Sequence, residues 1–145
     1  MGTRRKSPGL VPSEIFLSHS HTDHAATVRV AEVLRRHGVT SWFSERNILG
    51  AQQWLDEIGA ALERCDWFVV LLTPAAVESK WVKRELTYAL NEDRYDGRVV
   101  PLLVQECDYK KLAWPLSTLQ IIPFRRFPTG CAALLKLWGI GYQPR

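Results

Sequence analysis

The chain has 145 residues, of which 46% are hydrophobic and 23% are charged. This length fits one domain and is too short for a TIM barrel, which typically needs about 250 residues. The composition excludes a disordered chain, a collagen and a coiled coil. Three of the basic residues behind the net charge of +4, Arg4, Arg5 and Lys6, lie in the first six residues, so the rest is close to neutral. We therefore expect no nucleic acid as primary partner.

Residues 1–13 are basic and contain Pro and Gly, which predicts a flexible arm before a domain at 14–145. There is no apolar N-terminal run and no stretch of about 18 apolar residues, so we expect neither a signal peptide nor a membrane partner. The cysteines, Cys65, Cys107 and Cys131, are widely spaced and form no CxxC pair. This pattern indicates neither a disulfide framework nor a zinc ribbon, and it favours a cytoplasmic location.

Strand and helix patterns alternate along the first half of the chain. The predicted elements are a strand at 14–18, a helix at 22–37, a strand at 39–43, a polar loop at 44–52 and a helix whose apolar stripe is Trp54, Ile58, Ala61 and Leu62. The apolar positions of the first helix recur at helical spacing. Its N-terminal cap is expected to be Thr22 or Asp23.

The second half continues the alternation. The predicted elements are a strand at 66–72, a helix from Ser79 to about Glu92, a strand at 98–104, irregular chain at 105–118, a strand at 120–124 and a helix at 129–138. The first of these strands is continuously apolar, as expected of a parallel strand covered on both faces. The last strand should lie at an edge, because Pro123 lacks an amide donor. Alternating strands and helices predict an α/β fold with a mostly parallel sheet.

A group of histidines follows the first predicted strand. The sequence His19-Ser-His21-Thr-Asp23-His24 spells HxHxDH and resembles the metal-binding signature of the metallo-β-lactamase fold, which makes a zinc hydrolase a remote alternative. Such a hydrolytic site needs further histidines downstream. The only other histidine is His37, inside the first predicted helix. We therefore expect no metal site here and interpret the segment as a polar loop that begins a helix.

An acidic residue lies among aromatic ones in the helix after Ser79. Trp81, Glu85 and Tyr88 share one helical stripe, next to an apolar stripe that can face the sheet. A Glu beside a Trp has partly apolar surroundings that raise its pKa, as in many active sites. A surface Glu that pairs with Lys83 or Arg84 is the alternative, and the spacing alone leaves both open.

Five segments, in this order and spacing, together form a more specific pattern. They are Ile15-Phe-Leu-Ser18-His19, the Trp42-Phe43 strand end, Gly50 followed by Trp54 and Ile58, Cys65-Asp66, and Ser79-Lys-Trp-Val-Lys-Arg-Glu-Leu86. The pattern resembles a bacterial TIR (Toll/interleukin-1 receptor) domain from about residue 14 to 138. The resemblance implies a flavodoxin-like parallel sheet of about five strands, in the order 2-1-3-4-5, with helices on both faces. Ligands of such sheets bind at the carboxyl ends of strands 1 and 3.

Many TIR domains cleave NAD at the nicotinamide–ribose bond. The resemblance therefore implies an NAD+ nucleosidase that yields nicotinamide plus ADP-ribose or a cyclic ADP-ribose isomer, in bacterial immune signalling. Matched onto the motif, Glu85 is the catalytic residue, and Ser20, His21, Ile48 and Trp81 bind the substrate. We expect Glu85→Gln to abolish NAD cleavage and to change stability little, as for an exposed or cleft side chain.

The resemblance also implies other TIR domains as partners, by head-to-tail self-association through the loop at 44–50. A non-catalytic TIR–TIR scaffold is the competing function, since that loop would serve it equally well. No GxGxxG or Walker-type motif is present, so NAD is expected as a substrate and not as a redox cofactor.

Overall fold

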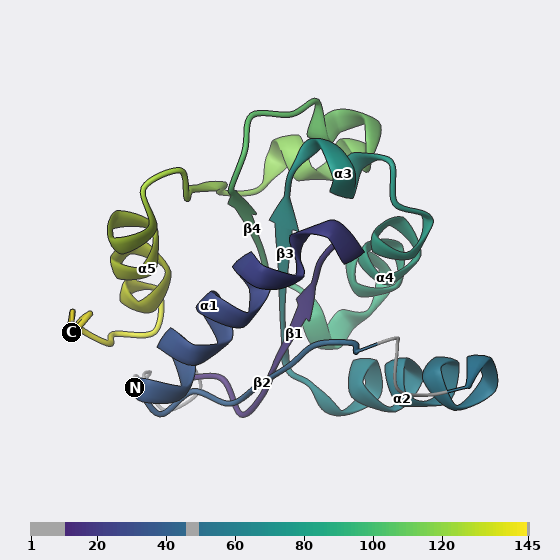
Figure 1. Cartoon of the computed structure of the whole chain (residues 1–145), viewed down its shortest axis with the longest axis horizontal. Coiled ribbons are helices and arrows are strands. Elements are labelled where there is room, and N and C mark those ends of the chain that lie inside the picture. Colours follow the sequence, from purple (N-terminus) through teal and green to yellow (C-terminus); the bar gives the residue numbers. More distant parts are fainter. Residues whose placement is uncertain (1–10, 46–49, 145) are drawn as a thin grey trace.

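In the part of the chain that the structure describes, five parallel strands form a central sheet, and helices cover both faces of this sheet (Figure 1). The computed structural model describes residues 11–45 and 50–144. The strand order is β2-β1-β3-β4-β5, as the resemblance implies. The strands are Ile15–Ser18 (β1), Ser41–Trp42 (β2), Trp67–Leu72 (β3), Val99–Leu103 (β4) and Ile122–Pro123 (β5).

The helices lie in two layers. They are His24–Arg36 (α1), Ala51–Arg64 (α2), Pro74–Val77 (α3), Lys80–Asn91 (α4) and Phe127–Lys136 (α5), with 3-10 turns at His21–Asp23, Asp93–Tyr95, Tyr109–Lys111 and Trp114–Thr118. Alternate residues of β1 point to opposite faces: Ile15 and Leu17 pack with α1 and α5, whereas Phe16 packs with α2, α3 and α4. No helix among the described residues is long and apolar enough to cross a bilayer.

The central strand confirms the sequence prediction. All six residues of β3 are buried, and the strand pairs with β1 on one side and β4 on the other. Both edge strands are shorter than predicted, with two residues each, because an edge strand has a hydrogen-bonding partner on one side only. Pro123 lies at an edge, as its missing amide requires.

Two local predictions differ from the structure. Helix α1 begins at His24, so Asp23 is its N-cap residue, as predicted, but the Asp23 side chain makes no capping hydrogen bond. Its carboxylate instead accepts a hydrogen bond from the Thr73 hydroxyl at 2.5 Å. The short helix α3 was not predicted. It forms because the Thr73 hydroxyl oxygen accepts a hydrogen bond from the Ala76 amide at 3.0 Å, and Pro74 suits the first turn of a helix.

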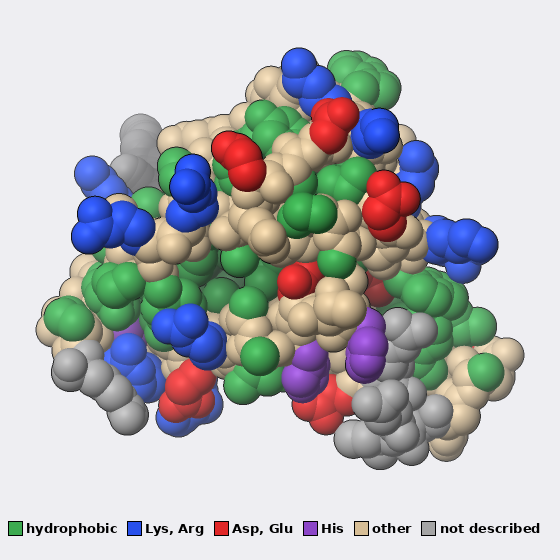
Figure 2. All heavy atoms as spheres, turned by 45° about the horizontal axis from the view of Figure 1, so that its top comes forward, with side chains coloured by type: hydrophobic (Ala, Val, Ile, Leu, Met, Phe, Trp, Pro, Cys, Tyr) green, Lys and Arg blue, Asp and Glu red, His purple; other side chains and the backbone are tan. Residues whose placement is uncertain are grey.

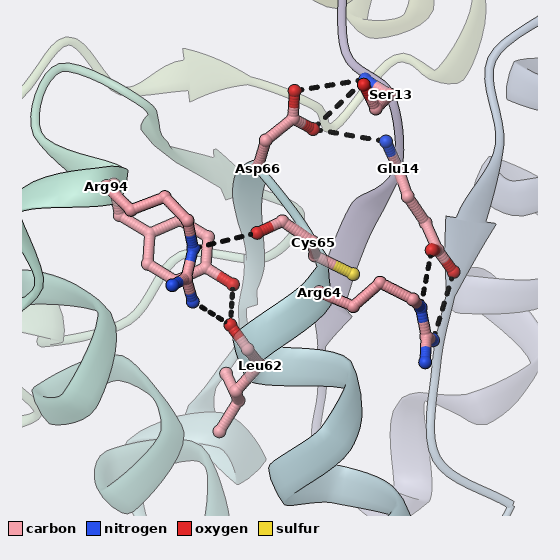
Figure 3. Close-up of polar contacts among 8 residues, drawn as sticks. Ser13, Glu14, Leu62, Arg64, Cys65, Asp66 and Arg94 are labelled. Atoms are coloured by element: carbon pink, nitrogen blue, oxygen red, sulfur yellow. Dashed lines mark hydrogen bonds and ion pairs between the residues drawn. The ribbon is translucent and has the colours of Figure 1, made fainter.

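The start of the sheet is held by polar contacts at the amino ends of β1 and β3 (Figure 3). The Asp66 carboxylate accepts hydrogen bonds from the backbone amides of Ser13 at 3.0 Å and Glu14 at 3.1 Å. The Glu14 carboxylate in turn pairs with Arg64 at 2.7 Å. Of the predicted arm, residues 1–10 lie outside the described part of the chain, and Ser13 is already held by Asp66.

Candidate active site

A cavity of about 390 Å³ opens at the carboxyl end of β1. Its walls come from β1 and the segment after it, the segment after β2, the first turn of α2 and the first two turns of α4. Figure 2 shows histidine side chains gathered beside acidic ones on one part of the surface, and the cavity lining includes three histidines and two glutamates: His19, His21, His24, Glu45 and Glu85.

The cavity is displaced from the position that the sequence suggests. The carboxyl ends of β1 and β3 do lie side by side, with Ser18 opposite Val70, but no residue of β3 lines the cavity. The hydrogen bond between Thr73 and Asp23 joins the loop after β3 to the loop after β1. The open space is therefore on the side of β1 that faces β2 and α4.

Helix α4 brings Glu85 into this cavity. The Ser79 hydroxyl oxygen caps the helix by accepting the Val82 amide at 3.2 Å. Val82 and Leu86 then pack against the sheet, and Glu85, on the helical stripe next to them, is also buried, with 6% of its surface exposed. Glu85 is thus more deeply buried than an exposed or cleft side chain.

The carboxyl of Glu85 has a single hydrogen-bonding partner among the described residues. The hydroxyl of Ser18, at the end of β1, donates to Glu85 Oε1 at 2.7 Å. Burial raises the pKa of Glu85 from 4.5 to about 7, and the hydrogen bond from Ser18 opposes this shift. The raised pKa agrees with the expectation from the aromatic stripe, although burial against the sheet, rather than Trp81 alone, causes it.

Two tryptophans form an aromatic wall of the cavity. The rings of Trp81 on α4 and Trp54 on α2 meet edge to face, with centroids 4.4 Å apart. The Trp54 indole donates to the hydroxyl of Ser44 after β2, and the Arg84 guanidinium lies 4.9 Å from the centre of the Trp81 ring. The wall thereby connects two helices and the loop after β2.

The other predicted binding residues differ in their positions. His21 lines the cavity with Trp81. Ser20 is buried beside it, with its hydroxyl 3.3 Å from that of Thr22, but it is not among the lining residues. Ile48 lies outside the described residues.

The histidines form an aromatic cluster. The ring centroids of His19 and His24 are 5.8 Å apart, and each of these two rings meets the ring of Phe43 in an edge-to-face arrangement. Burial lowers the pKa of His19. Within 11–45 and 50–144, no group of three or more His, Cys, Asp or Glu side chains has an arrangement suited to a metal ion.

Sequence reasoning did not assign Ser18 and Trp54 to the site. Ser18 carried a signal, because it ends the first strand two residues after Phe16 and so points toward the same helices. Trp54 also carried one, since it lies in the first turn of a helix that directly follows the loop after β2.

Curated relatives match part of the chain. NAD(+) hydrolase TcpC from Escherichia coli O6:H1 is 27% identical over 61% of this chain and 29% of that protein. The 2' cyclic ADP-D-ribose synthase BtTIR from Bacteroides thetaiotaomicron is 28% identical over 60% of this chain and 31% of that protein. The stimulator of interferon genes protein from Magallana gigas is 26% identical over 74% of this chain and 26% of that protein. The matched region makes up less than a third of each relative.

Solved structures show the same fold. The TIR domain of the Toll-related receptor TRR-2 from Hydra magnipapillata superimposes with a TM-score of 0.69 at 14% identity, over 84% of this chain and 94% of that one. The TIR domains of the activated Roq1 resistosome give a TM-score of 0.54 at 16% identity, over 86% of this chain and 78% of that one. The family model described as "TIR domain" matches residues 15–135. With its sheet order and its matched sequence, the chain belongs to the TIR domain family.

Proposed function

We propose that this domain cleaves NAD+ at the bond between nicotinamide and ribose, with Glu85 beside the ribose in the cavity. The observation that carries the proposal is the position of Glu85: a buried carboxyl that lines a cavity next to Trp81 and Trp54. The names of two relatives, an NAD(+) hydrolase and a 2' cyclic ADP-D-ribose synthase, support the same chemistry.

One carboxylate suffices for this reaction. In ordinary glycosidases a second carboxyl group protonates the leaving oxygen. In NAD+ the C–N bond breaks with its electron pair moving to the cationic pyridinium, so nicotinamide leaves neutral and needs no proton. The positive charge that develops on the ribose is stabilised by the nearby Glu85 carboxylate, an effect that is larger in a site removed from water. A pKa of about 7 leaves a large share of Glu85 ionised at neutral pH.

The product depends on what attacks the ribose cation. Water adds to the anomeric carbon and loses a proton, which gives ADP-ribose. A nucleophile within the same molecule, from the adenine or a ribose hydroxyl, gives a cyclic isomer. Ser20, His21, Ile48 and Trp81 are proposed to bind the nucleotide, and NAD+ acts as the substrate. The proposed setting is immune signalling in bacteria.

Self-association is part of the same proposal. We infer that the loop after β2, with Ile48 and Leu49, contacts a neighbouring TIR domain head to tail and completes that domain's cavity. Such heterologous contacts form open filaments when the rotation does not close. Specific activity should then rise with protein concentration, and Leu49→Glu in a folded protein should remove this rise. Activity that is independent of both changes would contradict the self-association.

The test of NAD cleavage is product analysis by mass spectrometry at high protein concentration. Glu85→Gln keeps the size of the side chain and removes its charge, and loss of one such electrostatic partner typically lowers the rate by about 10²–10³-fold. Glu78→Gln, at an exposed acid just before α4, is the control and should keep the wild-type rate. A folded wild-type protein that releases no nicotinamide would favour the non-catalytic scaffold.

A further inference from the structure

The last residue of β1 is polar where its neighbours are apolar. Ser18 follows Phe16 by two positions, so its side chain points to the face of the sheet that α4 covers. Only 1% of its surface is exposed, and it pairs in register with Val70 of β3. A hydroxyl at this buried position needs a hydrogen-bonding partner, because an unpaired buried polar group is costly.

The partner is one specific oxygen of Glu85. Ser18 Oγ donates to Oε1 at 2.7 Å, and no other hydrogen bond reaches either carboxyl oxygen from the described residues. Glu85 also lines the cavity, and Oε2 is not among the fully buried polar atoms that lack a partner in the described residues, so this oxygen is accessible to a ligand. The serine therefore fixes one end of the carboxyl group and leaves the other end for the substrate.

Other titratable groups surround the cavity without bonding to Glu85. Those from the segments after β1 and β2 are His19, His21, His24 and Glu45. On α4 itself, the neighbouring charges of Lys83 and Arg84 are exposed to solvent. Burial and Ser18 are the two causes that set the pKa of Glu85, and only Ser18 favours the ionised form.

We propose, on the basis of the proposed NAD cleavage, that Ser18 is a positioning residue, whose hydroxyl holds Oε1 of Glu85 so that Oε2 faces the ribose of the substrate. A hydrogen bond to a charged group in a buried site changes the ratio of its protonation states by about tenfold to a hundredfold. Loss of the hydroxyl therefore raises the pKa of Glu85 further. The active, ionised form then becomes scarce at neutral pH.

The experiment compares Ser18→Ala with two further variants. Ser18→Thr keeps the hydroxyl, and Thr27→Val removes a different buried hydroxyl, which donates to the Asp23 carbonyl and does not contact Glu85. Each protein is assayed for kcat and KM with NAD+ from pH 5 to 9. In the absence of NAD+, the carboxyl carbon of Glu85 is titrated by NMR in glutamate-labelled protein, with Glu85→Gln to assign the signal.

For Ser18→Ala we expect the midpoints of both the NMR titration and the acidic limb of kcat/KM to rise by about one to two pH units. At pH 7, kcat should fall about tenfold with a smaller change in KM. Ser18→Thr should restore the midpoint of the wild type, and Thr27→Val should leave it unshifted.

An unshifted NMR midpoint in folded Ser18→Ala overturns the role of Ser18, and so does a Ser18→Thr variant that titrates like Ser18→Ala. If Ser18→Ala does not fold, Ser18→Cys, whose thiol is a weaker donor, takes its place, and its midpoint should shift in the same direction by a smaller amount. A wild-type protein that cleaves no NAD+ refutes the proposed function. A normal wild-type rate with an unshifted midpoint refutes only the role of Ser18.

Discussion

Replacing Glu85 by Gln is expected to stabilise the folded protein at neutral and alkaline pH. Burial raises the pKa of Glu85 from 4.5 to about 7, so the folded state binds this proton more tightly than the unfolded state. Ionisation of Glu85 therefore lowers the free energy of unfolding of the wild type. This loss of stability is absent below about pH 4.5, grows up to pH 7 and is constant above it. At about 1.4 kcal/mol for each pH unit between the two values, the loss reaches about 3 kcal/mol.

Glutamine does not ionise, and its amide oxygen can still accept the hydrogen bond from Ser18. We expect the free energies of unfolding of Glu85→Gln and of the wild type to be similar at pH 4.5. At pH 8 the variant should be more stable by about 3 kcal/mol, which for a chain of this size raises Tm by about 6–12 °C. This corrects the expectation from sequence that the substitution changes stability little, because that expectation treats Glu85 as an exposed or cleft side chain.

The assay is guanidinium unfolding of both proteins at pH 4.5, 6, 7 and 8. Glu78→Gln serves as the matched control, because Glu78 is exposed and its replacement should not reproduce the gain in stability at pH 8. A pH-independent difference for Glu85→Gln, or a variant that is less stable than the wild type at pH 8, refutes the reasoning. A gain in stability together with the loss of NAD cleavage is the expected combination.

Two further predictions concern packing and metal content. Gly130→Ala should destabilise the protein by about 1–3 kcal/mol, since the added Cβ would lie 2.5 Å from the buried Phe124 ring. Gly59→Ala, with open space around it in α2, should stabilise the protein by about 1 kcal/mol. Equal effects of the two substitutions in urea unfolding would contradict the close packing of Gly130 against Phe124. Purified, tag-free protein should contain no stoichiometric zinc by elemental analysis, and one zinc per chain that is lost in His19→Ala would contradict this.

The sequence was sufficient for the order and type of the main elements. The continuous apolar run of β3 and the helical spacing in α1 and α4 are local patterns. In each of them, the apolar or polar character of a residue indicates whether its position is buried. Ser79 as the N-cap of α4 is also a local property, because the cap bonds to an amide three residues away. Such features depend on short stretches of chain, so they can be predicted without knowledge of the fold.

The site depended on contacts between distant segments. The sequence singled out Glu85 and Trp81 by their shared stripe, but neither the hydrogen bond from Ser18, 67 residues earlier, nor the contact between Trp81 and Trp54 is visible in the spacing. The burial of Glu85 likewise arises only when α4 packs on the sheet. The local pattern identified Glu85 as the candidate carboxyl, and tertiary packing decided its pKa and its hydrogen-bonding partner. When α4 packs against β1, the carboxyl is removed from water, which raises its pKa, and it comes within reach of the Ser18 hydroxyl.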